Sequence, residues 1–440
     1  MLGRVARAAV AGASRVGVRH TSRIAGFSKL SHEERLAAIQ SSSGISDEQV
    51  KELHAMRGID FELANRLVEN VVTTISIPVG VATNVIVDGV ERLVPMATEE
   101  SSVVAAVCNS AKQCRPTGGF FCSTSGPNMI AQVQLVNVSD PTAARFKILE
   151  KRAEIEKLCN ETDPVLTDFG GGFRDLEVRI VDSEGGPMVV THIVVDTRDA
   201  MGANAVNSMA ERLAPLVTEW TGGKVYLRIL SNLADRRLVR ARTVWPTDSI
   251  GGPDVRDGIV SAFQFADADP YRAATHNKGI MNGISAVVLA TGNDTRAIEA
   301  GAHAFASMTG RYRSLTRYEV TAEGDLAGSI ELPLAVGIVG GATKAHPTAK
   351  TCLDIMQCTD ADTLQRVIAS TGLAQNYGAL KALATVGIQK GHMSLHSGNV
   401  AMAAGAVGDE IEAVASEMVS RGEVRQDVAE KILADLRASK

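Results

Sequence analysis

Two patterns of hydrophobic and polar positions divide the chain. Between residues 129 and 231, short segments whose polarity alternates from one residue to the next predict strands, and apolar positions at helical spacing predict helices. The expected strands lie at 131–138, 176–183, 188–195 and 224–230, and the expected helices at 143–159 and 201–220. The order β-α-β-β-α-β is that of a ferredoxin-like split sheet. We therefore expect residues 129–231 to form a separate small domain inserted into a larger one.

The segments on either side of this small domain predict a mixture of helices and strands. Helical spacing runs from 30 to 72, and hairpins are expected over 85–94, with the turn at Asp88-Gly89, and between 318–322 and 331–341. After Pro347 the pattern is helical and rich in alanine. The sequence thus predicts an α+β fold with three parts: a large α/β substrate domain over 24–128 and 232–386, the inserted ferredoxin-like small nucleotide-binding domain over 129–231, and a C-terminal helical flap over 387–440.

Charged and amide side chains interrupt the apolar segments between Asp269 and Ala306. Residues 284–290 are expected to form a short buried strand, and residues 297–306 a helix. On this interpretation Lys278 precedes the strand and Asp294 lies in the turn after it, so the two charges meet and each changes the pKa of the other. On these two residues alone, a structural ion pair is the simpler interpretation.

A second polar cluster lies at the start of the apolar helix expected over 96–112. It consists of Glu99 and Glu100, followed by Ser101 and Ser102. Acids in the first turn of a helix commonly interact with the helix dipole. The apolar residues after Ser102 suggest instead that at least one glutamate is carried toward the interior, where its pKa would rise and it could deliver a proton.

Two further segments contain candidate residues. Asp199 opens a predicted helix, and Gly202 would let a ligand such as a pyrophosphate approach the helix amides, although helix packing explains a single glycine as well. No GxGxxG follows a strand, so a Rossmann site is not indicated. His392 follows Gly391 at a predicted helix start and could act as an acid–base group, whereas a lone histidine is more often a surface or cap residue.

Composition narrows the class of protein. The 440 residues are 45% hydrophobic and 22% charged, which permits a large core and two or three domains. The net charge of −5 gives no reason to expect a nucleic-acid partner. No run reaches the roughly 18 apolar residues of a membrane span, so we expect a soluble chain. The six cysteines show no CxxC pair and no metal-ligand spacing, and no metal site is predicted.

The N-terminal residues have a composition of their own. Residues 1–23 contain five arginines, and no acidic residue occurs before Glu33. This composition is typical of a mitochondrial transit peptide, and a disordered basic tail is the alternative. We therefore expect cleavage near residues 20–26 and a location in the mitochondrial matrix.

Seven stretches of the chain, taken in order, form a distinctive set. They are PVGVATN at 78–84, VPMATEESSVVAA at 94–106, VVDTRDAMGANAVN at 194–207, LSNLADRR at 230–237, DPYRAATHNKGIMNG at 269–283, VVLATGNDTRAIEAGAHA at 287–304 and GHMSLH at 391–396. Together they resemble one enzyme family, the 3-hydroxy-3-methylglutaryl-CoA (HMG-CoA) reductases of the soluble, bacterial-type class II. The resemblance runs from about Ser22 to near the end of the chain.

The resemblance implies a reaction and its catalytic residues. HMG-CoA would be reduced to mevalonate and CoA with two equivalents of NAD(P)H, for isoprenoid or sterol precursor synthesis, by a homodimer or a multiple of dimers. Lys278 would stabilise the negative charge that develops on the carbonyl oxygen, and Glu100 would protonate the aldehyde intermediate. Asp294 would couple Lys278 to Glu100 by hydrogen bonds, and His392 would protonate the departing CoA thiolate.

The same resemblance implies binding residues. Arg272 would pair with the free carboxylate of the substrate, assisted by Ser102 and Asn282. Gly398 stands where bacterial relatives carry an arginine, which leaves part of the recognition of the CoA phosphate open. The dinucleotide would be held by Asp199, Met201, Gly202, Asn204 and Asn232.

The choice of dinucleotide depends on Asp163, which precedes the glycines at 170–172. In similar enzymes an acid at this place favours NAD, because a carboxylate accepts from the ribose hydroxyl and repels a 2′-phosphate; an ordinary turn is the alternative. Biosynthesis usually draws on NADPH, so we favour NADPH, with NADH as the alternative. Two other functions stay open: a degradative, NAD-dependent oxidation of mevalonate, and a catalytically silent CoA-binding scaffold.

Overall fold

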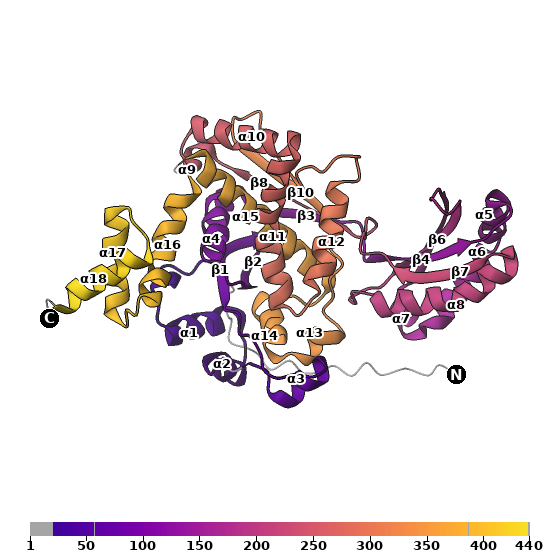
Figure 1. The fold of residues 1–440 in the computed structure, drawn as a ribbon, viewed down its shortest axis with the longest axis horizontal. Helices are drawn as coiled ribbons and strands as arrows, with labels where there is room; N and C mark the ends of the chain where they lie inside the picture. Colours follow the sequence, from indigo (N-terminus) through magenta and orange to yellow (C-terminus); the bar gives the residue numbers. More distant parts are fainter. Residues whose placement is uncertain (1–20, 57, 386, 439–440) are drawn as a thin grey trace, which may run out of the picture.

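The computed structural model describes residues 21–56, 58–385 and 387–438, apart from the side chains of 342, 344 and 388–395. Figure 1 shows three parts: a large central body, a small domain that extends to one side of it, and a helical unit at the opposite side. This arrangement confirms the predicted α+β class, with its large part, its inserted ferredoxin-like part and its helical C-terminal part.

The small domain is built on one antiparallel sheet with the order β5-β6-β4-β7. In chain order its elements are β4 (Asn128–Val136), α5 (Pro141–Glu150), α6 (Arg152–Thr162), α7 (Pro164–Asp168), β5 (Gly172–Val181), β6 (Met188–Asp196), α8 (Ala203–Thr221) and β7 (Lys224–Leu230). This is the predicted ferredoxin-like order. The single helix expected over 143–159 is wrong, because the chain leaves the helical conformation at Lys151 (φ −90°, ψ 11°). The buried positions keep one helical spacing across that break, so the apolar pattern does not reveal it.

The N-terminal part of the large body follows its capping signals. After a 3-10 turn at Phe27–Lys29 come α1 (His32–Ser43), α2 (Asp47–His54) and α3 (Phe61–Leu67), and complete capping boxes begin α1 at Ser31 and α2 at Ser46. The predicted hairpin is confirmed as β1 (Val79–Val87) and β2 (Val90–Ala97), and α4 (Val103–Cys114) follows it. Ser22 is buried against the hairpin, where its hydroxyl donates to the Val85 carbonyl at 2.9 Å.

A second antiparallel sheet forms the other half of the large body. Its order is β3-β8-β10-β9, from β3 (Phe121–Thr124), β8 (Leu238–Trp245), β9 (Thr316–Val320) and β10 (Leu326–Pro333). Helix α15 (Ala361–Ala384) packs across one face, where Trp245 stacks on Tyr377 with ring centroids 4.1 Å apart. Helices α9 (Thr247–Ile250), α10 (Pro253–Ala268) and α12 (Thr295–Ala306) belong to this half, whereas α13 (Gly341–Ala345) packs on α14 (Pro347–Met356), which packs on β2 and α1.

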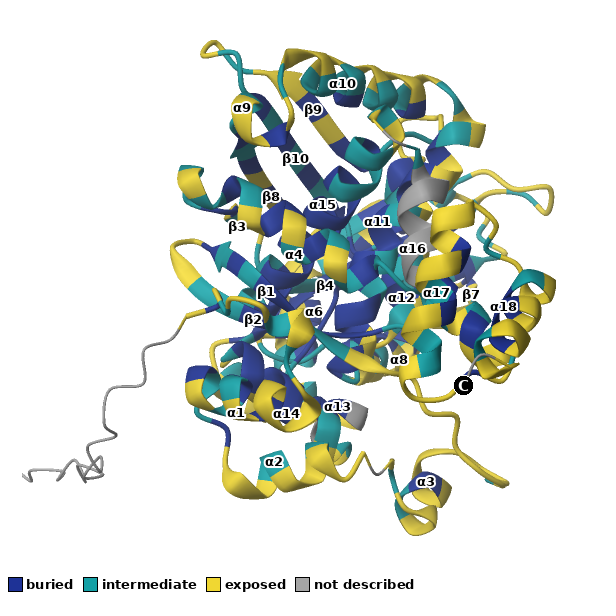
Figure 2. Ribbon diagram, turned by 90° about the vertical axis from the view of Figure 1, so that its left-hand side faces the viewer, coloured by how far each residue is buried: buried dark blue, intermediate teal, exposed yellow. Residues whose placement is uncertain are grey.

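One long helix occupies the place where a strand was predicted. Residues 284–290 belong to α11 (Pro270–Ala290), so the predicted strand is wrong. Helix α11 packs between β2, α4 and α15, and Figure 2 shows it among other mainly buried elements. A helix that is covered on several sides is apolar all round, and over seven residues its sequence cannot be told from that of a buried strand.

The C-terminal unit consists of α16 (Ile388–Ala403), α17 (Asp409–Arg421) and α18 (Gln426–Ala438). It has a small core of its own, which includes Val414, Met418, Ile432 and Leu433. The helical content that the sequence predicted is therefore present, and its movement as a flap stays a prediction. Across the described ranges, no helix has the length and apolar content needed to cross a bilayer.

Candidate active site

The loop before α4 and the middle of α11 bring three predicted site residues together. The Lys278 Nζ atom lies 2.9 Å from the Glu100 Oε2 atom, and the Asn282 side-chain amide donates to the same oxygen at 3.1 Å. Lys278 and Asn282 are four residues apart on α11, so they share one face of the helix. The structure thus places a cation, an amide donor and a carboxylate around one point.

This cluster is partly open to solvent, with Lys278 exposed and Glu100 and Asn282 of intermediate burial. The side chains of Lys278 and Glu100 are 63% and 37% exposed. The expectation that a glutamate of this segment would be carried into the interior is therefore wrong for Glu100, since the tight turn before α4 holds it at the surface. An exposed ion pair stabilises a fold by only about 0–1 kcal/mol, so fold stability does not account for the convergence of these three side chains.

Ser102 adopts an unusual backbone conformation next to this cluster. Its φ of 77° is left-handed, and it is the N-cap residue of α4, where its carbonyl accepts from the Ala106 amide at 2.8 Å. A non-glycine residue in this region stores about 1–3 kcal/mol of strain, and such strain is concentrated at functional sites. The turn brings Glu100 and Ser102 to the start of α4 together, which fits the predicted substrate-binding role of Ser102.

Asp294 lies in the turn where it was predicted, but it does not meet Lys278 there. It is the N-cap of α12, and its carboxylate accepts from the Arg296 and Ala297 amides at 3.0 and 3.1 Å. Lys278 lies twelve residues before the last residue of α11, which is about 18 Å along a helix axis. The predicted hydrogen bonds from Asp294 to Lys278 and Glu100 are therefore not formed within this part of the chain, and its catalytic role stays a prediction.

Arg272 lies in the first turn of α11, six residues before Lys278 and about 9 Å away along the axis. Partial burial lowers the pKa of its guanidinium. Its guanidinium forms no ion pair with any carboxylate in the described ranges, so it is available to an anionic ligand. Its pairing with the substrate carboxylate stays a prediction.

The loop between β6 and α8 holds three of the predicted dinucleotide residues, and the large body fixes it. The Asp199 carboxylate accepts from the Ala361 amide at 2.8 Å, and the Asp199 carbonyl accepts from the Ile338 amide at 2.9 Å. Gly202 has a φ of 97°, and a Cβ atom there would lie 2.4 Å from a Thr197 methyl carbon. Packing on Thr197 therefore requires this glycine, whether or not a ligand approaches it.

The remaining predicted dinucleotide residues differ in burial and position. Met201 is partly buried beside Gly202, Asn204 is exposed in the first turn of α8, and Asn232 is exposed after β7. Asp163 is the N-cap of the short helix α7, where its carboxylate accepts from the Leu166 amide at 2.9 Å. Its place is thus that of a turn residue, and its influence on cofactor choice stays a prediction.

The fourth predicted catalytic residue, His392, belongs to α16. Its side chain lies outside the described residues, so its role as a general acid stays a prediction.

A buried arginine, Arg237, which the sequence does not mark as a core residue, holds the β6–α8 loop. Arg237 is fully buried, and its guanidinium donates to Thr197 Oγ1 and to the Ala200 carbonyl, both at 3.1 Å, and to the carbonyls of Met201 and Val336 at 3.3 and 2.5 Å. Burial lowers its pKa to about 10. The sequence shows only two adjacent arginines at 236–237, which is the usual appearance of a surface segment.

A buried histidine that the sequence did not reveal, His276, lies on α11 two residues before Lys278. The Ser314 hydroxyl donates to the Thr316 carbonyl, and the Thr316 hydroxyl donates to the Asn376 Oδ1 atom. Both hydroxyls lie 2.8 Å from the His276 Nε2 atom, and the Asn376 amide nitrogen lies 3.3 Å from it, so three polar groups surround this ring nitrogen. The Nδ1 atom is buried and has no hydrogen-bond partner in the described residues.

His276 should make stability depend on pH. Burial, followed by the charge of Arg272, lowers its pKa to about 3, from about 6.5 in the unfolded chain. The folded state then binds fewer protons, so its contribution is complete above about pH 6.5 and falls as the pH drops toward 3, with a loss of about 2 kcal/mol at pH 5. In urea unfolding at pH 7.5 and pH 5, His276→Gln should reduce the difference between the two free energies by that amount. An unchanged difference would contradict this assignment.

Comparison with known proteins decides the family. Residues 31–397 match the family described as hydroxymethylglutaryl-coenzyme A reductase. The chain is 52% identical over 418 residues to the 3-hydroxy-3-methylglutaryl-coenzyme A reductase of Archaeoglobus fulgidus, and the match covers 95% of each chain. The chain belongs to the hydroxymethylglutaryl-coenzyme A reductase family. The predicted resemblance is thereby confirmed.

Two further relatives place the chain within this reductase family. A class II reductase from Streptococcus pneumoniae bound to NADPH matches with a TM-score of 0.80 and 42% identity, over 82% of this chain and 99% of that chain. A probable reductase of Borreliella burgdorferi is 37% identical over 341 residues, which are 75% of this chain and 76% of the relative. The chain is therefore a class II member of the reductase family, as the sequence motifs predicted.

The predicted mitochondrial location is wrong. The reductases just named come from an archaeon and two bacteria, which have no mitochondria. Residues 1–20, which contain most of the predicted transit peptide, lie outside the described residues. A transit peptide that ends at residue 23 would also remove Ser22, which the fold buries. These relatives give no support to a transit peptide, a matrix location or a role in sterol synthesis.

Proposed function

We propose that the chain reduces the thioester of HMG-CoA to the primary alcohol of mevalonate and releases CoA, for isoprenoid precursor synthesis. The observation that carries this proposal is the convergence of Lys278, Glu100 and Asn282 at one partly exposed point. Two hydrides and two protons are required to convert a thioester into an alcohol and a thiol. The reaction therefore needs a cation beside the carbonyl oxygen and a nearby proton donor, and this cluster has both.

Each residue of the cluster has a distinct task. The Lys278 ammonium, 2.9 Å from Glu100, would move its hydrogen bond to the carbonyl oxygen of the substrate as negative charge develops there. Protonated Glu100 would give its proton to the aldehyde oxygen in the second reduction. The Asn282 amide would keep the Glu100 carboxyl oriented while this proton moves. Arg272, one and a half turns earlier on α11, would bind the free carboxylate of a substrate.

The β6–α8 loop and the start of α8 present polar and cationic groups that suit the phosphates of a dinucleotide. Asn204 is exposed at the amino end of α8, where free amides favour a phosphate. Arg198 and Arg174 flank the buried Asp196 at 3.0 and 3.1 Å, and both guanidinium groups reach the surface. The bound nicotinamide would supply the hydride. The residues of this loop would hold and orient the cofactor.

We further propose that the cofactor is NADPH. The Streptococcus pneumoniae relative is described as bound to NADPH. Beside the loop, Arg174 and Arg198 share one carboxylate, that of Asp196. The excess of positive charge suits a 2′-phosphate. The Asp163 carboxylate already accepts from the Leu166 amide, which fits a capping role.

The experiment is nicotinamide oxidation by the full chain with HMG-CoA and either NADPH or NADH. We expect kcat/KM to be at least tenfold higher with NADPH. A preference for NADH would support a selecting role for Asp163 and the degradative direction. No turnover with either cofactor, in a folded chain that still binds CoA, would support a silent scaffold and refute the proposed reaction.

Glu100→Gln tests the proton donor. Glutamine keeps the size of the side chain and its contact with Asn282 but cannot deliver a proton. We expect turnover of HMG-CoA to fall by about 10²-fold or more, in the range typical of a general acid. Reduction of the free aldehyde intermediate should fall equally. Glu99→Gln is the matched control, and an equal loss in both variants would contradict the assignment to Glu100.

A further inference from the structure

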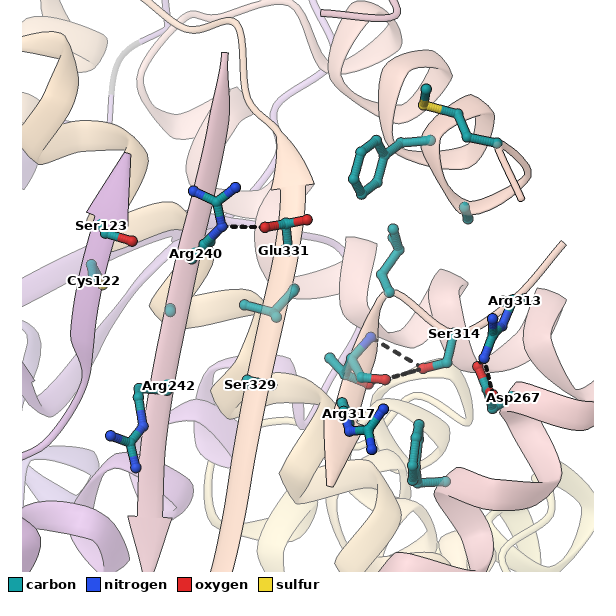
Figure 3. Close-up of a pocket in the computed structure, with 18 of the residues that line it drawn as sticks. Cys122, Ser123, Arg240, Arg242, Asp267, Arg313, Ser314, Arg317, Ser329 and Glu331 are labelled. Atoms are coloured by element: carbon teal, nitrogen blue, oxygen red, sulfur yellow. Dashed lines mark hydrogen bonds and ion pairs between the residues drawn. The ribbon is translucent and has the colours of Figure 1, made fainter. Parts of the chain in front are cut away.

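The sheet β3-β8-β10-β9 has one face that α15 does not cover. Along β8, β9 and β10, buried side chains alternate with exposed or half-buried ones, so successive residues point to opposite faces. Figure 3 shows Arg240 and Arg242 on β8, Ser329 and Glu331 on β10, and Arg317 on the third strand, along one wall of a pocket. These side chains lie on the face opposite to α15.

The strand register places two arginines on either side of one serine. Ser329 is paired directly with Arg242 of β8 and with Arg317 of β9. Neighbouring strands are about 4.8 Å apart, so the two arginine backbones are about 10 Å apart. Side chains of this length can bring both guanidinium groups together over the Ser329 hydroxyl.

Arg242 and Arg317 have fewer or longer ion pairs than the other arginines that line the pocket. Arg242 forms no ion pair in the described ranges, and Arg317 has only Glu319, at 3.8 Å. The other arginines of the pocket have strong partners: Arg240 pairs with Glu331, and Arg313 pairs with Asp267 at 2.6 Å. Beside Ser329, Arg242 is therefore without a carboxylate partner among the residues that the structure describes, and Arg317 has only a long contact with Glu319.

The remaining walls of the pocket combine apolar side chains with a few polar ones, among them Asp267, Thr309 and Ser314. Its volume of about 920 Å³ lies within the range of small-molecule sites. Phe121 and Met308 are half exposed into solvent. A ligand that fills this pocket would therefore combine an anionic group with an apolar part. The apolar lining residues are Phe121, Phe263, Phe305, Met308 and Leu315.

The pocket is also connected to the helix that carries Lys278. Its lining segment, residues 313–316, is bonded to α11 through His276 and Asn277. The Asn277 amide donates to the Arg313 carbonyl at 2.8 Å, and its Oδ1 atom accepts from the Leu315 amide at 3.1 Å. Lys278 is the next residue along α11. A ligand that moves residues 313–316 would act on the position of Lys278.

We propose that this pocket binds a small phosphate ester, with the phosphate between Arg242 and Arg317 and the apolar part against Phe121 and Met308. A phosphate matches two guanidinium groups and a hydroxyl better than a carboxylate does, because it carries up to two charges and more acceptor oxygens. The ligand is either the nucleotide part of CoA or a separate phosphorylated effector. The inference does not depend on the proposed reaction, since binding can be measured without turnover.

The test is calorimetric titration of the full chain with three probes: 3′-phosphoadenosine 5′-phosphate, hexyl phosphate and hexanoate. We expect at least one phosphate probe to bind, and hexanoate to bind at least tenfold more weakly. The double variant Arg242→Ala/Arg317→Ala should weaken phosphate binding at least tenfold. Its fold should persist because both side chains are exposed, and Arg242→Ala alone gives a milder second measurement. The matched control is Arg66→Ala, on the exposed surface of α3.

Kinetics distinguish the two sources of the phosphate. A nucleotide probe that raises the KM for HMG-CoA and leaves kcat unchanged would assign the pocket to CoA. Hexyl phosphate that changes kcat at constant KM would assign it to a separate effector acting through residues 313–316. The proposal is overturned if neither phosphate probe binds, if hexanoate binds as tightly, or if the double variant binds like the wild type.

Discussion

Lys278→Met should lower turnover of HMG-CoA by about 10²- to 10³-fold, because one preorganised donor to a developing oxyanion contributes that much. The Lys278 ammonium is the only cation that the structure describes in contact with Glu100, at 2.9 Å. Methionine keeps much of the length of the side chain and removes its charge. The loss should appear in kcat rather than in the binding of CoA, since the charge acts most strongly when negative charge develops on the substrate.

Because Lys278 is exposed, the Lys278→Met variant should separate an effect on turnover from an effect on folding. The lysine side chain is 63% exposed, so the variant should lose less than about 1 kcal/mol of stability and keep its melting temperature. Lys157→Met is the matched control, because Lys157 is also an exposed lysine beside a glutamate, Glu161 at 3.8 Å. Turnover near wild type in a folded Lys278→Met chain would refute the proposed mechanism.

Arg237→Met should have the second large effect, a loss of about 3–5 kcal/mol of unfolding free energy. The fully buried guanidinium donates to four oxygens, three of them main-chain carbonyls. Methionine cannot donate to any of them, and each buried acceptor without a partner costs about 1–3 kcal/mol. Arg237→Lys should recover part of the loss, since one ammonium can satisfy some of these acceptors.

The neighbouring residue provides the control for this measurement. Arg236 is exposed and meets Glu177 only at 3.5 Å, so Arg236→Met should change stability by less than about 0.5 kcal/mol. Urea unfolding can be followed through Trp245, which is fully buried on β8. Because Arg237 holds the carbonyls of Ala200 and Met201, its variants should also raise the KM for the dinucleotide more than that for HMG-CoA. Equal unfolding midpoints for the two methionine variants would contradict this account.

Local chemistry allowed much of the fold to be predicted from the sequence. The ferredoxin-like order follows from a polarity that alternates with period two in strands and repeats at helical spacing in helices. The turn at Asp88-Gly89 and the cap at Ser31 depend on residues only a few positions apart. The motifs around Glu100 and Lys278 likewise identified the family, because each motif is continuous in the sequence.

Features of the fold and of the site that depend on contacts between distant segments were decided only by the tertiary structure. The mainly apolar residues 284–290 became part of α11 because β2, α4 and α15 surround that helix, and periodicity cannot show how many sides of a segment are covered. Once α11 is a helix, Lys278 and Asp294 are separated along its length, and Lys278 meets Glu100 instead, 178 positions away in the sequence. Arg237 became a core residue because carbonyls of two different loops converge on it. The sequence by itself determined the family, the candidate site residues and most local elements, because these depend on continuous motifs and local periodicity; only packing between distant segments determined which of those residues meet.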